Sequence, residues 1–224
     1  MPEVIFSGPA GRIEGRYHHS TIKGAPMALI LHPHPQHGGT MNNKVVYNLF
    51  QVFAKRGFST LRFNFRGVGR SQGQFDRGEG ELADAAAALD WLQSCNTQSS
   101  ICWVAGFSFG AWIAMQLLMR RPEIARFIAI APPAGIFDFG FLAPCPSSGL
   151  IVAGGEDELI QGAAVEALVK KLTAQRGLII DHEVVKGANH YFTDRLDELS
   201  QVVGSYIERT FHQQPAARTK AKRA

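Results

Sequence analysis

Residues 101–120, ICWVAGFSFGAWIAMQLLMR, hold the pattern that decides the fold of this chain. Residues 101–107 form an apolar run typical of a buried β-strand, and residues 109–120 place apolar side chains at helical spacing. Gly106 and Gly110 stand on either side of Ser108, where the two segments meet. Small residues at these positions let a strand and a helix approach each other closely. The stretch therefore predicts a sharp strand-to-helix turn with a serine at its tip.

Strand and helix signals alternate along the rest of the chain. The predicted strands cover residues 12–18, 26–31, 59–65, 101–107, 126–130, 149–153 and 178–185, and the predicted helices cover 44–55, 79–93, 109–120, 161–172 and 192–210. Helices between successive strands favour parallel pairing, which gives an α/β sheet covered on both faces. Because no helix separates residues 12–18 from 26–31, we expect these two strands to form an antiparallel edge.

Length and composition indicate one globular domain. The chain has 224 residues, 46% of them apolar, which is within the usual size of a single domain. No apolar run reaches the roughly 18 residues that a membrane span needs, and the first residues lack the features of a secretory signal. Cys95, Cys102 and Cys145 are odd in number and form no pattern, which fits reduced thiols. We therefore expect a cytoplasmic protein.

The net charge of +4 is concentrated at the C-terminus. Residues 213–224 contain four basic side chains and no acid, so the rest of the chain is neutral; the four are Arg218, Lys220, Lys222 and Arg223. A neutral body lacks the broad electrostatic footprint that binds nucleic acid. We expect a folded domain at 1–212, with neither nucleic acid nor membrane as its partner, and a disordered basic tail at 213–224. A tether to nucleic acid or to an anionic membrane is the alternative for the tail.

Ser108 is the candidate nucleophile. A serine hydroxyl is reactive only when a neighbouring base takes its proton and the backbone holds it exposed, and a sharp turn does the second. The turn also places Ser108 at the start of a helix, where free backbone N–H groups and the positive end of the dipole favour an oxyanion. The alternative is a glycine-rich turn with a buried serine.

His190 is the candidate base, because it lies directly after the last predicted strand and before the last helix. His182 lies inside that strand, so its ring cannot swing over the strand's end. The candidate acid is Asp157, which follows the strand at 149–153, since catalytic groups gather beyond the carboxyl ends of parallel strands. Asp138, after the preceding strand, is the competitor, and the sequence leaves this choice open.

Residues 31–39, LHPHPQHGG, predict one donor of an oxyanion hole. The other donor is expected to be the backbone N–H of Phe109, the residue after the nucleophile. Pro33 and Pro35 have no N–H, so His34 between them is the expected partner.

Two further patterns have weaker chemical interpretations. The spacing of His32, His34 and His37 suggests a metal site, but no cysteine or carboxylate in the segment completes the ligand set. Residues 67–73, GVGRSQG, suggest a dinucleotide loop, but the last glycine is one place late for that pattern. We therefore expect no metal and no cofactor, and interpret residues 67–73 as a turn at the edge of the pocket.

The motifs LHPHP, GGTMNNKVV, FNFRGVGRSQG, GFSFG, GGEDE and GANH follow one another in an order that resembles the α/β-hydrolase superfamily. Over about residues 5–210 the chain is similar to its small lid-less bacterial members, in the dienelactone-hydrolase-like group. The resemblance implies the α/β-hydrolase fold, with Ser108 as nucleophile, His190 as base and Asp157 as the orienting acid. It also implies an oxyanion hole formed by the amides of His34 and Phe109. Dienelactone hydrolases use a cysteine as nucleophile where this chain has a serine, so their substrate does not carry over.

The segment 131–148, APPAGIFDFGFLAPCPSS, is too short for the helical lid of many such hydrolases. Its Phe137, Phe139, Phe141 and Leu142 are candidates for an acyl pocket, and the alternative is that they cover the sheet. The expected function is a cofactor-free serine hydrolase that cleaves small or medium acyl esters, like a carboxylesterase. A thioesterase, a short-peptide hydrolase and a non-catalytic module that binds a small molecule are the alternatives on the same fold.

Overall fold

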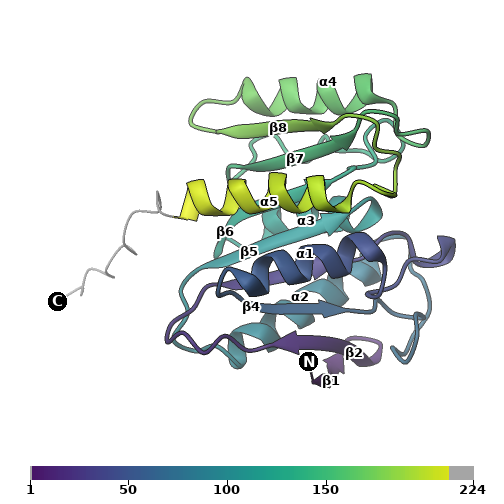
Figure 1. The fold of residues 1–224 in the computed structure, drawn as a ribbon. Coiled ribbons are helices and arrows are strands. Elements are labelled where there is room, and N and C mark those ends of the chain that lie inside the picture. The colour runs from purple at the N-terminus through teal and green to yellow at the C-terminus, as the bar shows by residue number, and fades with distance from the viewer. Residues whose placement is uncertain (1, 212–224) are drawn as a thin grey trace.

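An eight-stranded sheet forms the centre of the structure, a computed structural model that describes residues 2–211 (Figure 1). Its strands are β1 (Glu3–Gly8), β2 (Gly11–His18), β3 (Met27–Leu31), β4 (Ser59–Phe63), β5 (Cys102–Phe107), β6 (Ile124–Ile130), β7 (Gly149–Gly154) and β8 (Ile180–Val185). They lie in the order β1-β2-β4-β3-β5-β6-β7-β8. Strands β3 to β8 pair in parallel, whereas β2 is antiparallel to both of its neighbours. The α/β-hydrolase fold, a mostly parallel sheet with an antiparallel N-terminal edge, is thereby confirmed.

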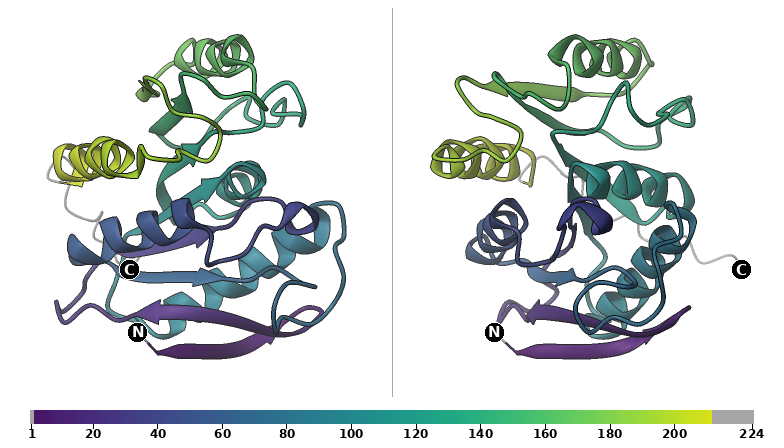
Figure 2. Two further views of the ribbon diagram at one scale, coloured as in Figure 1. Left: turned by 45° about the vertical axis from the view of Figure 1, so that its right-hand side comes forward. Right: turned by 90° about the vertical axis from the view of Figure 1, so that its right-hand side faces the viewer.

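Helices cover both faces of this sheet (Figure 2). On one face lie α1 (Lys44–Lys55) and α5 (Leu196–Phe211), and on the other lie α2 (Glu79–Ser94), α3 (Phe109–Arg120) and α4 (Gly162–Thr173). The loop after β3 adds a short 3₁₀ helix, Pro35–His37. None of the helices formed by residues 2–211 has the length and hydropathy of a membrane span. The predicted basic tail at 213–224 lies outside the described residues.

The expected pairing of residues 12–18 with 26–31 is wrong. Strand β2 pairs with β1 and β4, and β3 lies inside the sheet between β4 and β5. All five residues of β3 are buried, because helices cover it on both sides. Strand β1 is absent from the prediction. It lies at the edge of the sheet, and Phe6 is the one residue of this strand that is buried.

Several boundaries also differ from the predicted ones by a few residues. The largest shift is at the start of α5, which begins at Leu196 instead of residue 192. Phe192 and Asp194 have backbone φ angles of 53° and 59°, which a right-handed helix does not accept. The loop between β8 and α5 is therefore longer than its apolar pattern indicates.

Two apolar cores meet at the central strand β5. Phe107, the last residue of β5, packs in the core shared with α1 and α5, whereas Phe109 at the start of α3 packs in the core shared with α2, α3 and α4. Ser108 lies between these two residues, at the carboxyl end of the strand. The fold therefore holds Ser108 at the edge of the sheet, between its two covered faces.

Candidate active site

Ser108 stands at a tight turn between β5 and α3. Its backbone has φ 54° and ψ −120°, a conformation that a residue with a side chain adopts only under strain. Gly106 and Gly110 make the turn possible: a Cβ at Gly106 would overlap with the backbone of Gly110, and a Cβ at Gly110 would overlap with the carbonyl oxygens of Leu31 and His32. The predicted strand-to-helix turn is present, and the glycines act by their lack of a side chain.

His190 connects Ser108 to Asp157. Its Nε2 lies 3.1 Å from the Oγ of Ser108, and its Nδ1 lies 2.8 Å from the Oδ2 of Asp157. The side chains of His190 and Asp157 are both only 4% exposed. Because a carboxylate only accepts, the imidazole donates its Nδ1–H to Asp157, and Nε2 is the ring atom that can accept the Ser108 hydroxyl proton. The three side chains thus form one hydrogen-bonded chain.

The carboxylate of Asp157 is fixed by the loop that carries it. Its Oδ1 accepts hydrogen bonds from the backbone N–H groups of Leu159 (2.9 Å) and Ile160 (2.8 Å). Burial alone would raise the pKa of Asp157, but the hydrogen bond from His190 and those from the backbone outweigh it and leave the pKa lowered. Asp157 is therefore held as an anion against the His190 ring.

Asp138 lies elsewhere. Its side chain is exposed and accepts a hydrogen bond from the backbone N–H of Gly140 at 2.7 Å, and its carbonyl oxygen accepts the indole N–H of Trp112 at 2.9 Å. Of the two acids that the sequence leaves open, the structure brings Asp157 to His190.

The two residues expected to form an oxyanion hole lie side by side. Phe109 is the first residue of α3, so its N–H has no acceptor within the helix. The ring of His34 lies 4.9 Å from the ring of Phe109, centroid to centroid. That the amides of these two residues form the oxyanion hole stays a prediction.

His32 has a role that its sequence pattern does not reveal. The ring is fully buried, and its Nε2 accepts the backbone N–H of Phe65 at 3.0 Å while its Nδ1 donates to the carbonyl oxygen of Pro33 at 2.6 Å. Burial lowers the pKa of His32 to about 3, so the ring is neutral. His32 thus joins the loop of His34 to the segment that follows β4.

That segment is anchored by two buried acids of α2. Asp84 binds Arg66 through both carboxylate oxygens, at 2.9 and 3.0 Å, and Glu81 accepts the backbone N–H groups of Asp76 (3.0 Å) and Gly78 (2.7 Å). The Asp84 hydrogen bond raises the pKa of Arg66. The loop formed by residues 66–78, which includes the glycine-rich 67–73, is therefore rigidly attached to α2.

The attachment holds Phe75 against the predicted oxyanion residues. Its ring lies 4.8 Å from that of His34 and 6.1 Å from that of Phe109. Phe75 lies beside the predicted site, and the sequence prediction omits it. Its place in an otherwise polar loop, QFDRG, is a signal that could have pointed to it. Residues 67–73 form a turn that contacts the β1–β2 hairpin, where Gln72 pairs with the backbone of Arg12. Their place at the edge of the pocket stays a prediction.

The four candidates for an acyl pocket separate into two groups. Phe139 (6% exposed) and Leu142 (0%) are buried in the core, as the alternative of covering the sheet requires. Phe137 is half-buried, with its ring 5.9 Å from that of Phe109 and 4.6 Å from that of Trp112. Phe141 is half-buried and stacks on Phe139. Of the four, Phe137 has the contact that places it beside the residue following Ser108.

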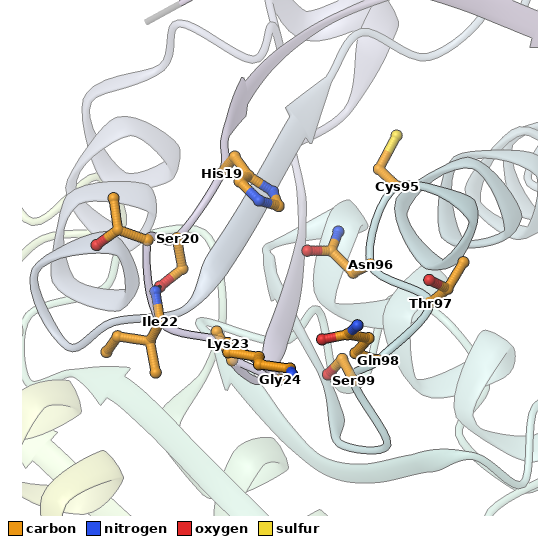
Figure 3. A pocket seen from close by; sticks show the side chains of 12 residues that line it. His19, Ser20, Ile22, Lys23, Gly24, Cys95, Asn96, Thr97, Gln98 and Ser99 are labelled. Atoms are coloured by element: carbon orange, nitrogen blue, oxygen red, sulfur yellow. The ribbon is translucent and has the colours of Figure 1, made fainter.

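One hollow has a volume of about 240 Å³, and Figure 3 shows the side chains that line it. Residues 19–25 and 95–99 line it, next to the amino ends of β3 and β5. Ser108 follows the carboxyl end of β5, so this hollow is at the opposite edge of the sheet and takes no part in the site. Within residues 2–211, no group of three or more potential ligands is arranged to hold a metal ion.

Comparisons with known proteins agree with this architecture. Residues 36–150 match the family model described as the alpha/beta hydrolase fold. An uncharacterized protein of Rickettsia prowazekii is 51% identical over 211 residues, which cover 92% of this chain and 89% of that protein.

Solved structures give the same result. A protein of unknown function from Agrobacterium tumefaciens, thought to be an alpha/beta hydrolase, is 59% identical, with a TM-score of 0.93 over 97% of this chain and 100% of the other. A serine hydrolase without a lid from Xanthomonas campestris is 30% identical, with a TM-score of 0.84 over 97% and 96% of the two chains. Like the sheet order and the family match, these likenesses show that this chain belongs to the alpha/beta hydrolase fold family.

Proposed function

We propose that this protein is a serine hydrolase that cleaves esters of small or medium acyl groups through Ser108, His190 and Asp157. The observation that carries the proposal is the position of His190, whose two ring nitrogens lie within hydrogen-bond distance of Ser108 and Asp157 at once. A nucleophile, a base and an orienting acid in this geometry are the elements of acyl transfer. The Xanthomonas campestris relative, a serine hydrolase without a lid, supports the same assignment.

The first half of the reaction transfers the acyl group to the protein. Nε2 of His190 takes the hydroxyl proton as the Oγ of Ser108 attacks the ester carbonyl, and the carbonyl oxygen becomes an oxyanion held by the amides of Phe109 and His34. Asp157 stabilises the imidazolium that forms. The tetrahedral intermediate then expels the alcohol, whose oxygen receives the proton from Nε2.

The second half returns the protein to its starting state. Water replaces the alcohol, gives a proton to His190 and adds to the acyl carbon. The bond between Ser108 and the acyl group breaks, the carboxylic acid leaves, and the proton on Nε2 returns to the Oγ of Ser108. The sum is ester plus water giving acid plus alcohol, with no cofactor required.

A fluorophosphonate probe read by intact mass tests the proposal, because it reacts only with an activated serine. We expect one adduct on the wild-type protein and none on Ser108→Ala or His190→Ala. Ser205→Ala is the matched control, since Ser205 is an exposed serine of α5 and should leave labelling unchanged. A folded wild-type protein that is not labelled would favour a non-catalytic binding module instead.

The leaving group is tested separately. A phenyl ester, a phenyl thioester and an anilide of the same acyl group have leaving groups that share the phenyl ring and differ in the atom bound to the acyl carbon. We expect the highest kcat/KM for the oxygen ester. A higher value for the thioester or the anilide would reassign the protein as a thioesterase or a short-peptide hydrolase.

A further inference from the structure

Two surfaces of different chemistry meet at Ser108. Phe107 before it belongs to the core under α1 and α5, and Phe109 after it belongs to the core under α2, α3 and α4. The ring of His190 contacts Phe107, at 5.2 Å between centroids, and so lies on the α1–α5 side. Each face of the sheet therefore supplies its own side chains to one side of the serine.

The side of α2 and α3 is aromatic. Three half-buried rings surround the ring of Phe109: Phe75 at 6.1 Å, Trp112 at 5.6 Å and Phe137 at 5.9 Å between centroids. The ring of His34 lies 4.8 Å from Phe75 and completes the group. We call these five rings the aromatic shelf. It carries no charged side chain, so it suits an apolar group, and flat rings above all.

The side of α1 and α5 holds a hollow that charged and apolar side chains line together. A hollow of about 440 Å³ opens at the N-terminal ends of these two helices, and its lining includes Lys44, Tyr191, Asp194 and Asp197. Tyr191 is 46% exposed, and its ring lies 5.2 Å from the ring of His190, edge to face. Tyr191 therefore lines the hollow and also contacts the ring of the proposed base. We call this hollow the polar hollow.

Charged groups of the polar hollow are free to bind a ligand. No ion pair within residues 2–211 involves Lys44, Asp194 or Asp197. A carboxylate accepts two hydrogen bonds from neighbouring hydroxyls, and an ammonium donates to hydroxyl oxygens. With two acids and one base, the hollow disfavours an anionic ligand, and its carboxylates and ammonium group can bind the hydroxyl groups of a neutral one.

The proton that His190 gives to the leaving oxygen decides which part of the substrate lies on which surface, if the proposed function is the starting point. His190 must protonate the leaving oxygen, so the alcohol lies on the His190 side and the acyl group on the other side of Ser108. We propose that the substrate is an ester of an apolar, aromatic acyl group with a polyhydroxylated alcohol, a polyol or a sugar. The acyl group lies on the aromatic shelf and the alcohol in the polar hollow. Hydrolysis breaks the ester C–O bond, and water supplies the hydroxyl of the acid and the hydrogen of the alcohol.

Four esters test both halves: the methyl and the glyceryl esters of acetate and of 3-phenylpropionate. For the wild-type protein we expect kcat/KM to be about tenfold higher for the glyceryl ester than for the methyl ester. One or two charge-assisted hydrogen bonds to the glyceryl hydroxyls would give an increase of this size. We expect a rise of similar size from acetate to 3-phenylpropionate. Equal values for the methyl and glyceryl esters, or for the two acyl groups, would overturn the corresponding half.

Variants separate the polar hollow from a general effect on the protein. In Asp194→Asn/Asp197→Asn, the glyceryl-to-methyl ratio of kcat/KM should fall towards one. Asparagine accepts the positive φ of residue 194, so the backbone is not disturbed. Glu166→Gln removes one exposed acid from α4, on the other face, and should leave the ratio as in the wild type. An unchanged ratio in the aspartate variant would overturn the role of the hollow.

Fluorophosphonate labelling distinguishes failure of this inference from failure of the proposed function. A labelled protein that shows no preference among the four esters retains its activated serine but overturns the substrate class. A folded protein that is neither labelled nor active on any ester overturns the serine hydrolase itself, and the substrate class with it.

Discussion

The imidazole Nδ1 of His190 lies 2.8 Å from the carboxylate of Asp157, although the two residues follow different strands. Asp157 comes after β7 and His190 comes after β8, and these strands are parallel neighbours in the sheet. Their carboxyl ends therefore meet at the same edge, where β5 also delivers Ser108. The sheet order is the physical cause of the hydrogen-bonded chain.

Replacing Asp157 tests its role as the orienting acid. Asp157→Asn keeps the size of the side chain but removes the charge that stabilises the imidazolium, and it favours the other tautomer of His190. We expect kcat to fall by about 10⁴-fold, the effect of the same change in a serine protease. Asp138→Asn is the matched control and should change kcat by less than about twofold, since Asp138 is exposed and bound to its own loop. Equal losses in both variants would remove Asp157 from the proposed mechanism.

The close approach of α3 to β3 predicts a large effect of one methyl group. In Gly110→Ala the new Cβ overlaps with the carbonyl oxygens of Leu31 and His32, which cannot move without shifting β3. We expect the free energy of unfolding, measured in urea, to fall by about 3 kcal/mol or more. Gly162→Ala, where no heavy atom lies within 4 Å of the new Cβ, should change it by less than about 1 kcal/mol. A similar small effect at both positions would show that the turn is not tightly packed.

Backbone strain at Ser108 predicts a difference between two inactive variants. Both Ser108→Ala and Ser108→Gly lack the hydroxyl, but only glycine accepts φ 54° and ψ −120° without a steric cost. Ser108→Gly should therefore have a free energy of unfolding about 1 kcal/mol higher than that of Ser108→Ala. In α5 the order should be reversed for Ser205→Gly and Ser205→Ala, because alanine is the better helix former. If the alanine variant were more stable than the glycine variant at residue 108 as well as at residue 205, strain at Ser108 would be excluded.

Burial of His32 predicts a loss of stability in acid. Its pKa is about 3 in the folded protein and about 6.5 in the unfolded chain, so between these values only the unfolded chain binds the proton. The contribution is fully present above about pH 6.5 and is lost as the pH falls towards 3, at about 1.4 kcal/mol per pH unit. His32→Gln keeps an acceptor for the Phe65 N–H but does not titrate. Between pH 6.5 and 3, the free energy of unfolding should therefore fall less steeply with acid in this variant, by about 1.4 kcal/mol per pH unit. Equal slopes for the variant and the wild type would contradict the prediction.

The positions of the helices, the parallel strands and Ser108 could be predicted because they depend on near neighbours in the chain. Apolar spacing decides which residues form helices and strands. Gly106 permits the turn through its close approach to the backbone of Gly110, a near neighbour in the chain. His190 could be predicted from its place after the last strand. Asp157 was preferred to Asp138 on the same ground, but the sequence left the choice open.

Tertiary structure alone decided the features that depend on distant residues. Strand β3 lies in the middle of the sheet, and β2 pairs with β1 and β4. Which strands pair depends on hydrogen bonds between segments that are far apart in the chain and meet only on folding.

Phe139 and Leu142 are buried in the core. Phe75 contacts His34 because a buried acid of α2, Glu81, fixes the loop that carries Phe75. A sequence specifies which side chains are apolar and which can react. Which of them share one side of a serine is determined by the order of the strands and by the helices that cover each face.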